Sequence, residues 1–172
     1  GIRMLFVGGL VVPVQLIILP IFIMFRQIGI LGSLWSLIVV YSVFGIPLGV
    51  LVLTGFFGIL PRDLEDAARI DGASHFQIFW RIMLPLTRPA LAAVVILNGV
   101  WMWNDFFLGF ILITKPEDMT LPVGIMAFRG TYSTEWGLIF ASVTISVLPV
   151  VGAYLLLSRQ FIAGLTAGSV KG

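Results

Sequence analysis

The sequence contains no cysteine and very few charged residues. Without cysteine, disulfide bonds and thiolate metal sites are excluded. Charged residues make up 10% of the chain, against about 25% in an ordinary soluble domain, whereas 59% of the residues are hydrophobic. A soluble fold of this size needs more polar surface, so the composition predicts a polytopic membrane protein.

Several kinds of functional site also lack the residues they would need. The net charge is only +2 and basic residues form no run, so nothing indicates binding to nucleic acid. Histidine occurs once, at His75, and neither a His-Glu-x-x-His nor a Gly-x-Ser-x-Gly motif is present. A phosphate-binding Gly-x-x-x-x-Gly-Lys-Ser/Thr loop is missing as well. We therefore expect no catalytic residues, metal site or cofactor, and any ATP hydrolysis would require another subunit.

Long runs with little charge predict membrane-spanning helices. Met4–Phe25 has no charge over 22 residues, and such a helix is about 33 Å long, against a hydrocarbon core of about 30 Å. The predicted spans are Met4–Phe25, Leu34–Phe57, Pro89–Thr114 and Trp136–Ser158. The predicted fold is one all-α domain over residues 1–172, a transmembrane bundle of four helices.

The start of the chain could be taken for a signal peptide, because Arg3 precedes an apolar run. That run is too long for a signal peptide and no small-residue cleavage site follows, so a true span is expected. Since Gly1 is not an initiator methionine, we expect this to be the later part of a longer protein.

Glycine and proline lie inside the spans. Pro13 and Pro20 would leave carbonyl groups of the first span without partners, so neighbouring helices or water should satisfy them. Gly45 and Gly49 flank Pro47 in the second span. These small residues would allow close helix packing, and a local kink at Pro47 is the alternative.

The distribution of Lys and Arg predicts the orientation. Four spans place both chain ends and the loop between the second and third spans on one side. That side carries seven basic residues and the other side three. Because positive residues accumulate on the cytoplasmic side, the loop and the C-terminus are predicted to be cytoplasmic. The seven are Arg3, Arg62, Arg69, Arg81, Arg88, Arg159 and Lys171; the three are Arg26, Lys115 and Arg129.

The loop, residues 61–88, is the most highly charged part of the chain, with four of the ten basic and four of the eight acidic residues. Pro61 suits the first position of a helix, and acidic residues follow in the early turns, where the helix dipole favours them. Gly72 permits a turn. Ser74 and Gln77 have the spacing of a capping box, so a second helix should begin there.

Each short helix has a face suited to contact with another surface. The first carries Leu64, Ala67, Ala68 and Asp71 on one side. The second carries Phe76, Phe79, Trp80 and Met83, and Pro85 and Pro89 should end it. The loop could be solvated, with a helix lying on the membrane surface. The small, acidic first helix favours docking against a protein over an anionic lipid surface.

The loop also has a fixed spacing: Ala67-Ala68, three residues, Gly72, nine residues, then Ile82-x-Leu84-Pro85. In this pattern it resembles the EAA loop of the membrane subunits of ATP-binding-cassette (ABC) importers. The glutamate of that motif falls on Asp66, and Glu65 beside it could compensate. Which of the two carboxylates makes the contact therefore stays open.

Four other segments are similar to the carbohydrate-uptake branch of these importers, the MalG-like permeases. They are Asp71-Gly72-Ala73-Ser74, Trp103-Asn104-Asp105-Phe106, Thr120-Leu121-Pro122-Val123-Gly124 and Gly164-Leu165-Thr166-Ala167-Gly168. The similarity covers essentially the whole chain. Such permeases usually have six spans, so this chain would supply the last four.

The resemblance implies a sugar importer in a bacterial or archaeal plasma (inner) membrane. Its implied partners are a second permease subunit, two ABC ATPase subunits that bind the ATP, an extracytoplasmic solute-binding protein and the lipid bilayer. ATPase closure would move the loops and rock the spans between inward- and outward-facing states. The tail after Arg159 would either reach the ATPases or be disordered. The residues implied to couple to the ATPase are Glu65, Asp66, Ala67, Ala68, Asp71, Gly72, Phe76 and Phe79.

Asp105 is the only charged residue of the predicted third span. An ionisable group near the centre of a span costs about 2.5–3.5 kcal/mol on insertion scales, so Asp105 should lie in a cavity or be paired. One interpretation is a translocation path formed with Asn98, Trp101 and Asn104. The other is a structural hydrogen bond to a neighbouring helix.

Two alternatives for function remain. The nearer is an ABC permease for a solute other than a sugar. The other is an ion channel or secondary transporter, which would be expected to carry more ionisable residues within its spans than Asp105 alone.

Overall fold

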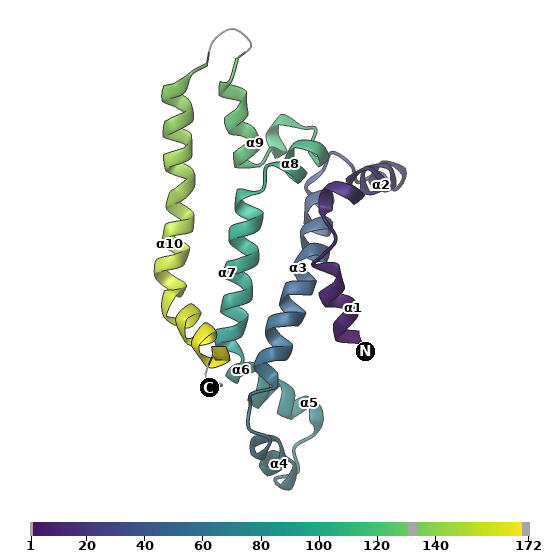
Figure 1. Ribbon diagram of the computed structural model, residues 1–172, viewed down its shortest axis with the longest axis vertical. Helices are drawn as coiled ribbons and strands as arrows, with labels where there is room; N and C mark the ends of the chain where they lie inside the picture. The colour runs from purple at the N-terminus through teal and green to yellow at the C-terminus, as the bar shows by residue number, and fades with distance from the viewer. Residues whose placement is uncertain (1, 131–133, 170–172) are drawn as a thin grey trace.

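The computed structural model describes residues 2–130 and 134–169, which are almost entirely helical (Figure 1). Its longest helices are α3 (Leu34–Phe57), α7 (Arg88–Asn104) and α10 (Trp136–Ser169). Helix α7 lies between the other two and packs against both (Figure 1). The only extended pairing in the described residues is a single antiparallel bridge between Arg129 and Thr134. The predicted all-α class is therefore confirmed.

Within the described residues, two helices are long and apolar enough to cross a membrane, Leu34–Phe57 and Trp136–Leu156. Two bent pairs also qualify if each is taken as one span: Arg3–Gly9 with Val14–Gln27, bent by 94°, and His75–Leu86 with Arg88–Asn104, bent by 65°. The count of four therefore depends on how the bent pairs are treated.

The first predicted span, Met4–Phe25, is wrong as a single helix. It consists of α1 (Ile2–Gly9) and α2 (Val14–Gln27). Pro13 is the N-cap residue of α2, directly before its first residue, and has extended geometry. It has no N–H to donate to a preceding turn and disfavours helical geometry at the residue before it. Helix α1 runs alongside α3, whereas α2 is bent by 94° from α1 and runs in a different direction (Figure 1).

The third predicted span, Pro89–Thr114, is also wrong as a single helix. Helix α7 ends at Asn104, Asp105 is extended, and a separate short helix α8 follows at Phe107–Leu112. An aspartate that hydrogen-bonds the backbone ahead of it offers the chain an alternative to continuing a helix. Asp105 does this, as described below.

The other two spans differ in how well the prediction fits. Helix α3 has the predicted bounds. Helix α10 begins as predicted at Trp136 but continues past Ser158 to Ser169. Of the two alternatives for the tail after Arg159, a disordered terminus is therefore wrong as far as Ser169, and contact with the ATPases stays a prediction. Side chains beyond Leu156 lie outside the description.

A hydrophobic cluster holds α2, α3 and α8 together. Phe25 of α2, Leu37 and Val40 of α3, and Leu108 and Leu112 of α8 are all buried there. The turn before α3 is tied to the same place, because the Gly32 N–H donates to the Leu112 carbonyl at 2.9 Å. Beyond α8, the chain forms a 3₁₀ turn (Pro116–Asp118), α9 (Leu121–Ile125) and another 3₁₀ turn (Met126–Phe128) before α10.

Small residues bring α3 and α7 close together, as predicted from the glycines around Pro47. A Cβ added at Gly45 would lie 3.4 Å from both Asn98 Nδ2 and Met102 Cε, and one at Gly49 would lie 3.7 Å from Val94. Asn98 Nδ2 also donates to the Gly45 carbonyl at 3.3 Å.

Candidate coupling loop and transport path

The charged loop protrudes from one end of the molecule, below the long helices in Figure 1. It contains α4 (Asp63–Ile70), α5 (His75–Ile78), a π-helical turn (Phe79–Met83) and α6 (Leu84–Leu86). Gly72 has φ of +79°, which only glycine adopts easily. The Ser74 N–H donates to Gln77 Oε1 at 2.8 Å, and the Gln77 N–H donates to Ser74 Oγ at 3.3 Å. The predicted turn and capping box are both confirmed.

The prolines of the loop act differently from the prediction. Pro61 lies outside α4, which begins at Asp63. Pro85 lies inside α6 rather than ending the helix. In a regular α-helix a proline ring clashes with the carbonyl four residues earlier. Here a π turn, which is wider than an α turn, comes directly before α6, and the Leu84 N–H is bonded to the Phe79 carbonyl. The chain thus passes Pro85 and reaches α7 with a bend.

The two halves of the loop are packed against each other and against the end of α3. Ala68 of α4 is buried with Ile78 and Met83, and Phe57 and Leu60 cover the same cluster. Ala68 therefore does not lie on the outer surface as expected for a residue that contacts a partner. Its small side chain instead allows α4 and α5 to approach each other, which makes the loop one packed unit.

The outer surface of the loop carries aromatic rings. Phe76 is 72% exposed, and its ring centroid lies 5.9 Å from that of Trp80, which lies 5.5 Å from that of Phe79. Large exposed aromatic groups next to one another are typical of binding surfaces. Trp80 was not among the predicted coupling residues, although its position in the apolar stripe was a signal for it.

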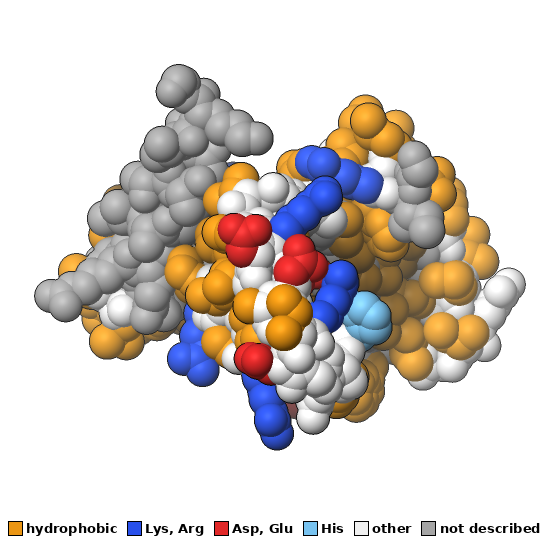
Figure 2. All heavy atoms as spheres, turned by 90° about the horizontal axis from the view of Figure 1, so that it is seen from below, with side chains coloured by type: hydrophobic (Ala, Val, Ile, Leu, Met, Phe, Trp, Pro, Cys, Tyr) orange, Lys and Arg blue, Asp and Glu red, His pale blue; other side chains and the backbone are white. Residues whose placement is uncertain are grey.

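Acidic side chains lie on the same protrusion, with basic side chains among them (Figure 2). Arg69 contacts both candidate carboxylates, with Glu65 Oε2 at 3.4 Å and Asp66 Oδ1 at 3.6 Å. Asp71 and Gly72 follow on the exposed turn, and Ala67 is exposed as well. Exposed ion pairs of this kind are worth about 0–1 kcal/mol, so a basic side chain of a partner could replace Arg69 easily.

A cavity of about 380 Å³ lies between the loop and the end of α3. Apolar side chains form most of its wall, and Glu65 and His75 supply polar groups. Glu65 therefore borders a recess, whereas Asp66 does not. No group of three or more potential metal ligands occurs in the described part of the chain.

Three of the four predicted path residues lie on one side of α7 and of the residue directly after it. Asn98, Trp101 and Asp105 have i, i+3, i+7 spacing and all contact α3: Asn98 at Gly45, and the other two at Tyr41. Asn104 is not brought to this face, because its Nδ2 donates to the Val100 carbonyl of its own helix at 2.7 Å.

Asp105 Oδ2 accepts three hydrogen bonds. The Tyr41 hydroxyl donates at 3.0 Å, the Leu108 N–H at 3.0 Å and the Gly109 N–H at 3.2 Å. The carboxylate thus caps α8 and fixes it to α3. Trp101 stacks edge-on against Tyr41, with ring centroids 5.7 Å apart. Sequence reasoning missed Tyr41; a hydroxyl-bearing aromatic residue in an apolar span was the available signal.

Comparison with known proteins gives relatives along almost the whole chain. Residues 1–162 match the family described as binding-protein-dependent transport system inner membrane component. The chain is 36% identical over 170 residues to the probable starch degradation products transport system permease protein AmyC of Thermoanaerobacterium thermosulfurigenes, covering 99% of this chain and 62% of AmyC. It is 34% identical over 169 residues to the multiple sugar-binding transport system permease protein MsmG of Streptococcus mutans, covering 97% of this chain and 61% of MsmG.

A solved structure shares the fold. A chain of a bacterial ABC transporter involved in the import of the acidic polysaccharide alginate superposes with a TM-score of 0.67 at 23% identity, over 83% of this chain and 55% of that chain. The chain spans about three fifths of the length of the curated relatives described above. It belongs to the family of binding-protein-dependent transport system inner membrane components, the permease subunits of ABC transporters.

Proposed function

We propose that this protein is a permease subunit of a binding-protein-dependent ABC importer for carbohydrates. It would form part of the translocation path and transmit ATP-driven motion from cytoplasmic ATPase subunits through residues 61–88. The family and the helical fold support this proposal. In this arrangement the four crossings are formed by α1 with α2, by α3, by α7 and by α10. The loop, including His75–Leu86, and the C-terminus would lie in the cytoplasm.

The observation that supports coupling best is the construction of the loop. Its interior cluster joins α4, α5 and the end of α3. A displacement of the loop would therefore be transmitted to a spanning helix through packed side chains. Its outer surface presents Phe76, Phe79 and Trp80, and the same loop carries Glu65 and Asp66, of which Glu65 lines a recess together with Phe79. Aromatic anchors with acidic neighbours suit a partner that offers an apolar cleft and a basic residue.

The partners follow from this role. Two ATPase subunits would bind the loops of this chain and of a second permease subunit, and an extracytoplasmic binding protein would deliver the solute. The ATPases would bind the ATP, since this sequence has no phosphate-binding loop.

Carbohydrate is the solute class that the relatives favour, because the printed names of AmyC, MsmG and a diacetylchitobiose permease, NgcG, refer to sugars. A second candidate is a different small solute, since an equally similar relative, GgtD of Synechocystis, is named for osmoprotective compounds. Uptake of labelled sugars and of such compounds by the reconstituted importer distinguishes the two.

Charge reversal at the loop tests the coupling role. In the complete importer, changing both Glu65 and Asp66 to Lys should abolish solute uptake while the ATPase subunits still hydrolyse ATP. Asp66→Glu, which keeps the charge and restores the glutamate of the family motif, should transport like the wild type. Normal uptake by the double Lys variant, with the ATPase bound, would show that the loop carboxylates have no coupling role.

A further inference from the structure

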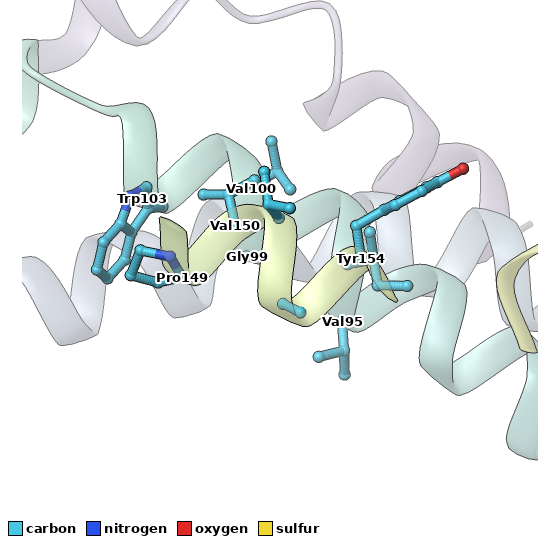
Figure 3. A pocket seen from close by; sticks show the side chains of 10 residues that line it. Val95, Gly99, Val100, Trp103, Pro149, Val150 and Tyr154 are labelled. Carbon is cyan, nitrogen blue, oxygen red and sulfur yellow. The ribbon is translucent and has the colours of Figure 1, made fainter. Parts of the chain in front are cut away.

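An apolar groove of about 540 Å³ runs between α7 and α10. All of its described lining residues are aliphatic, aromatic or glycine. Trp103 and Pro149 lie at one end, and Val95 and Tyr154 lie towards the other (Figure 3). Gly99 lies between these ends, and Val150 faces it from α10 (Figure 3).

Two features keep this groove open. No atom lies within 4 Å of the position that a Cβ would occupy at Gly99. At the end of the groove, Trp103 Nε1 donates to the Ser146 carbonyl of α10 at 3.0 Å, which holds the indole ring in place. Other described residues leave this part of α10 uncovered, because none of the most hydrophobic 18-residue stretch of Trp136–Leu156 is buried inside the structure.

A basic residue continues the line of the groove along α7. Arg88, Val95 and Gly99 have i, i+7, i+11 spacing and share one face of the helix. Arg88 lies about 10 Å beyond Val95 along the axis, towards the loop end. It is exposed and forms none of the ion pairs found in the described residues. Its long side chain can extend towards the membrane surface while its stem stays along the helix.

We propose that the groove binds an acyl chain of an anionic phospholipid whose phosphate contacts Arg88. The dimensions fit one leaflet: the groove extends for about 12 Å from Val95 to Trp103, against about 15 Å for half of the hydrocarbon core. Arg88, a further ~10 Å along α7, then reaches the head-group layer. A spanning helix of the same or of another subunit could fill the apolar part, but an apolar helix would not supply a partner for the cation at the end of the groove.

The head group decides the selectivity. An acyl chain gains no hydrophobic free energy by leaving the bilayer for an equally apolar groove. The preference for an anionic over a zwitterionic lipid should therefore be about five-fold, equivalent to the ~1 kcal/mol that one basic residue contributes near an anionic surface.

Photolabelling of the complete importer tests the proposal. The complex is reconstituted in vesicles of phosphatidylcholine and phosphatidylglycerol containing a trace of either lipid with a photoreactive group in one acyl chain, and labelled peptides are mapped by mass spectrometry. Peptides of α7 and α10 that line the groove should be labelled about five-fold more by the phosphatidylglycerol probe. Arg88→Gln should remove this preference, and Arg81→Gln should leave it unchanged.

Filling the groove provides the second arm. Gly99→Leu should abolish labelling of the groove peptides by either probe. Gly137→Leu is the matched control, because Gly137 is also a helical glycine with no atom within 4 Å of its Cβ position and lies outside the groove. Wild-type groove peptides left unlabelled while other membrane-facing peptides react would show that a protein helix fills the groove. Equal labelling by both probes, or an unchanged pattern in Gly99→Leu, would also overturn the proposal.

Discussion

Removing the Asp105 carboxylate should destabilise the junction between α3, α7 and α8. In Asp105→Ala, the Tyr41 hydroxyl and the N–H groups of Leu108 and Gly109 lose their acceptor. Leu108 and Gly109 are buried, so water cannot easily replace the carboxylate. Loss of a helix cap costs about 0.5–2 kcal/mol, and each buried donor left unpaired costs about 1–3 kcal/mol. Because the three bonds share one oxygen and relaxation recovers part of the loss, we expect the free energy of unfolding to fall by about 2–4 kcal/mol.

Two further variants separate the cap from the bond to Tyr41. Asp105→Asn keeps a side-chain oxygen that caps a helix about equally well. Its free energy of unfolding should therefore fall by less than about 1 kcal/mol through the cap. Tyr41→Phe removes only the hydroxyl and should lose about 1.5–3 kcal/mol, the range for a bond to a charged group. In the double variant Tyr41→Phe/Asp105→Ala the losses should be less than additive, because both changes remove the same bond.

Equilibrium unfolding in mixed micelles, followed by circular dichroism, measures these changes. Asp118→Ala is the matched control, since the Asp118 side chain makes no hydrogen bond or ion pair within the described residues. If Asp105→Ala unfolded at the same denaturant concentration as the wild type but transported poorly, the carboxylate would be a path residue and the structural reasoning would be refuted.

Two other predictions concern helix packing and topology. Gly45→Leu should push α7 away from α3 and lower the free energy of unfolding by about 1–3 kcal/mol. Gly55→Leu is the control in the same helix and should be nearly neutral, because no atom lies within 4 Å of the Cβ position of Gly55. Equal losses in the two variants would contradict the close approach at Gly45. Single cysteines at Ser74 and Thr134, in a chain that has no other cysteine, should react with a membrane-impermeant maleimide from opposite sides of the membrane; labelling from the same side would contradict the proposed four crossings.

Sequence reasoning succeeded where the signal was local. Helix α3 has the predicted bounds because the uncharged run from Gln27 to Pro61 contains one segment of spanning length, and Gly58 is the C-cap residue at its end. The loop turned at Gly72 and restarted at Ser74 as predicted, because a positive φ and a capping box depend on residues within a few positions of each other.

The features that were missed depend on distant residues. Asp105 ends α7 partly because Tyr41, 64 residues away in sequence, supplies a hydrogen bond to the same carboxylate oxygen that caps α8. Helical periodicity showed that Ala67 and Ala68 share a face of α4, but not that Ile78 and Met83 would cover Ala68. The predicted end of the fourth span at Ser158 rested on the charge of Arg159, which marks the end of an apolar run but does not end a helix.

Cross-linking between the loop and an ATPase subunit tests the central claim most directly. In the assembled importer, cysteine placed at Phe76, which is 72% exposed, should cross-link to the ATPase through a short bifunctional maleimide, and cysteine at Glu117, beyond α8 at the other end of the molecule, should not. Intact complexes in which the Phe76 position never cross-links to the ATPase, or in which the Glu117 position does so equally well, would contradict the account.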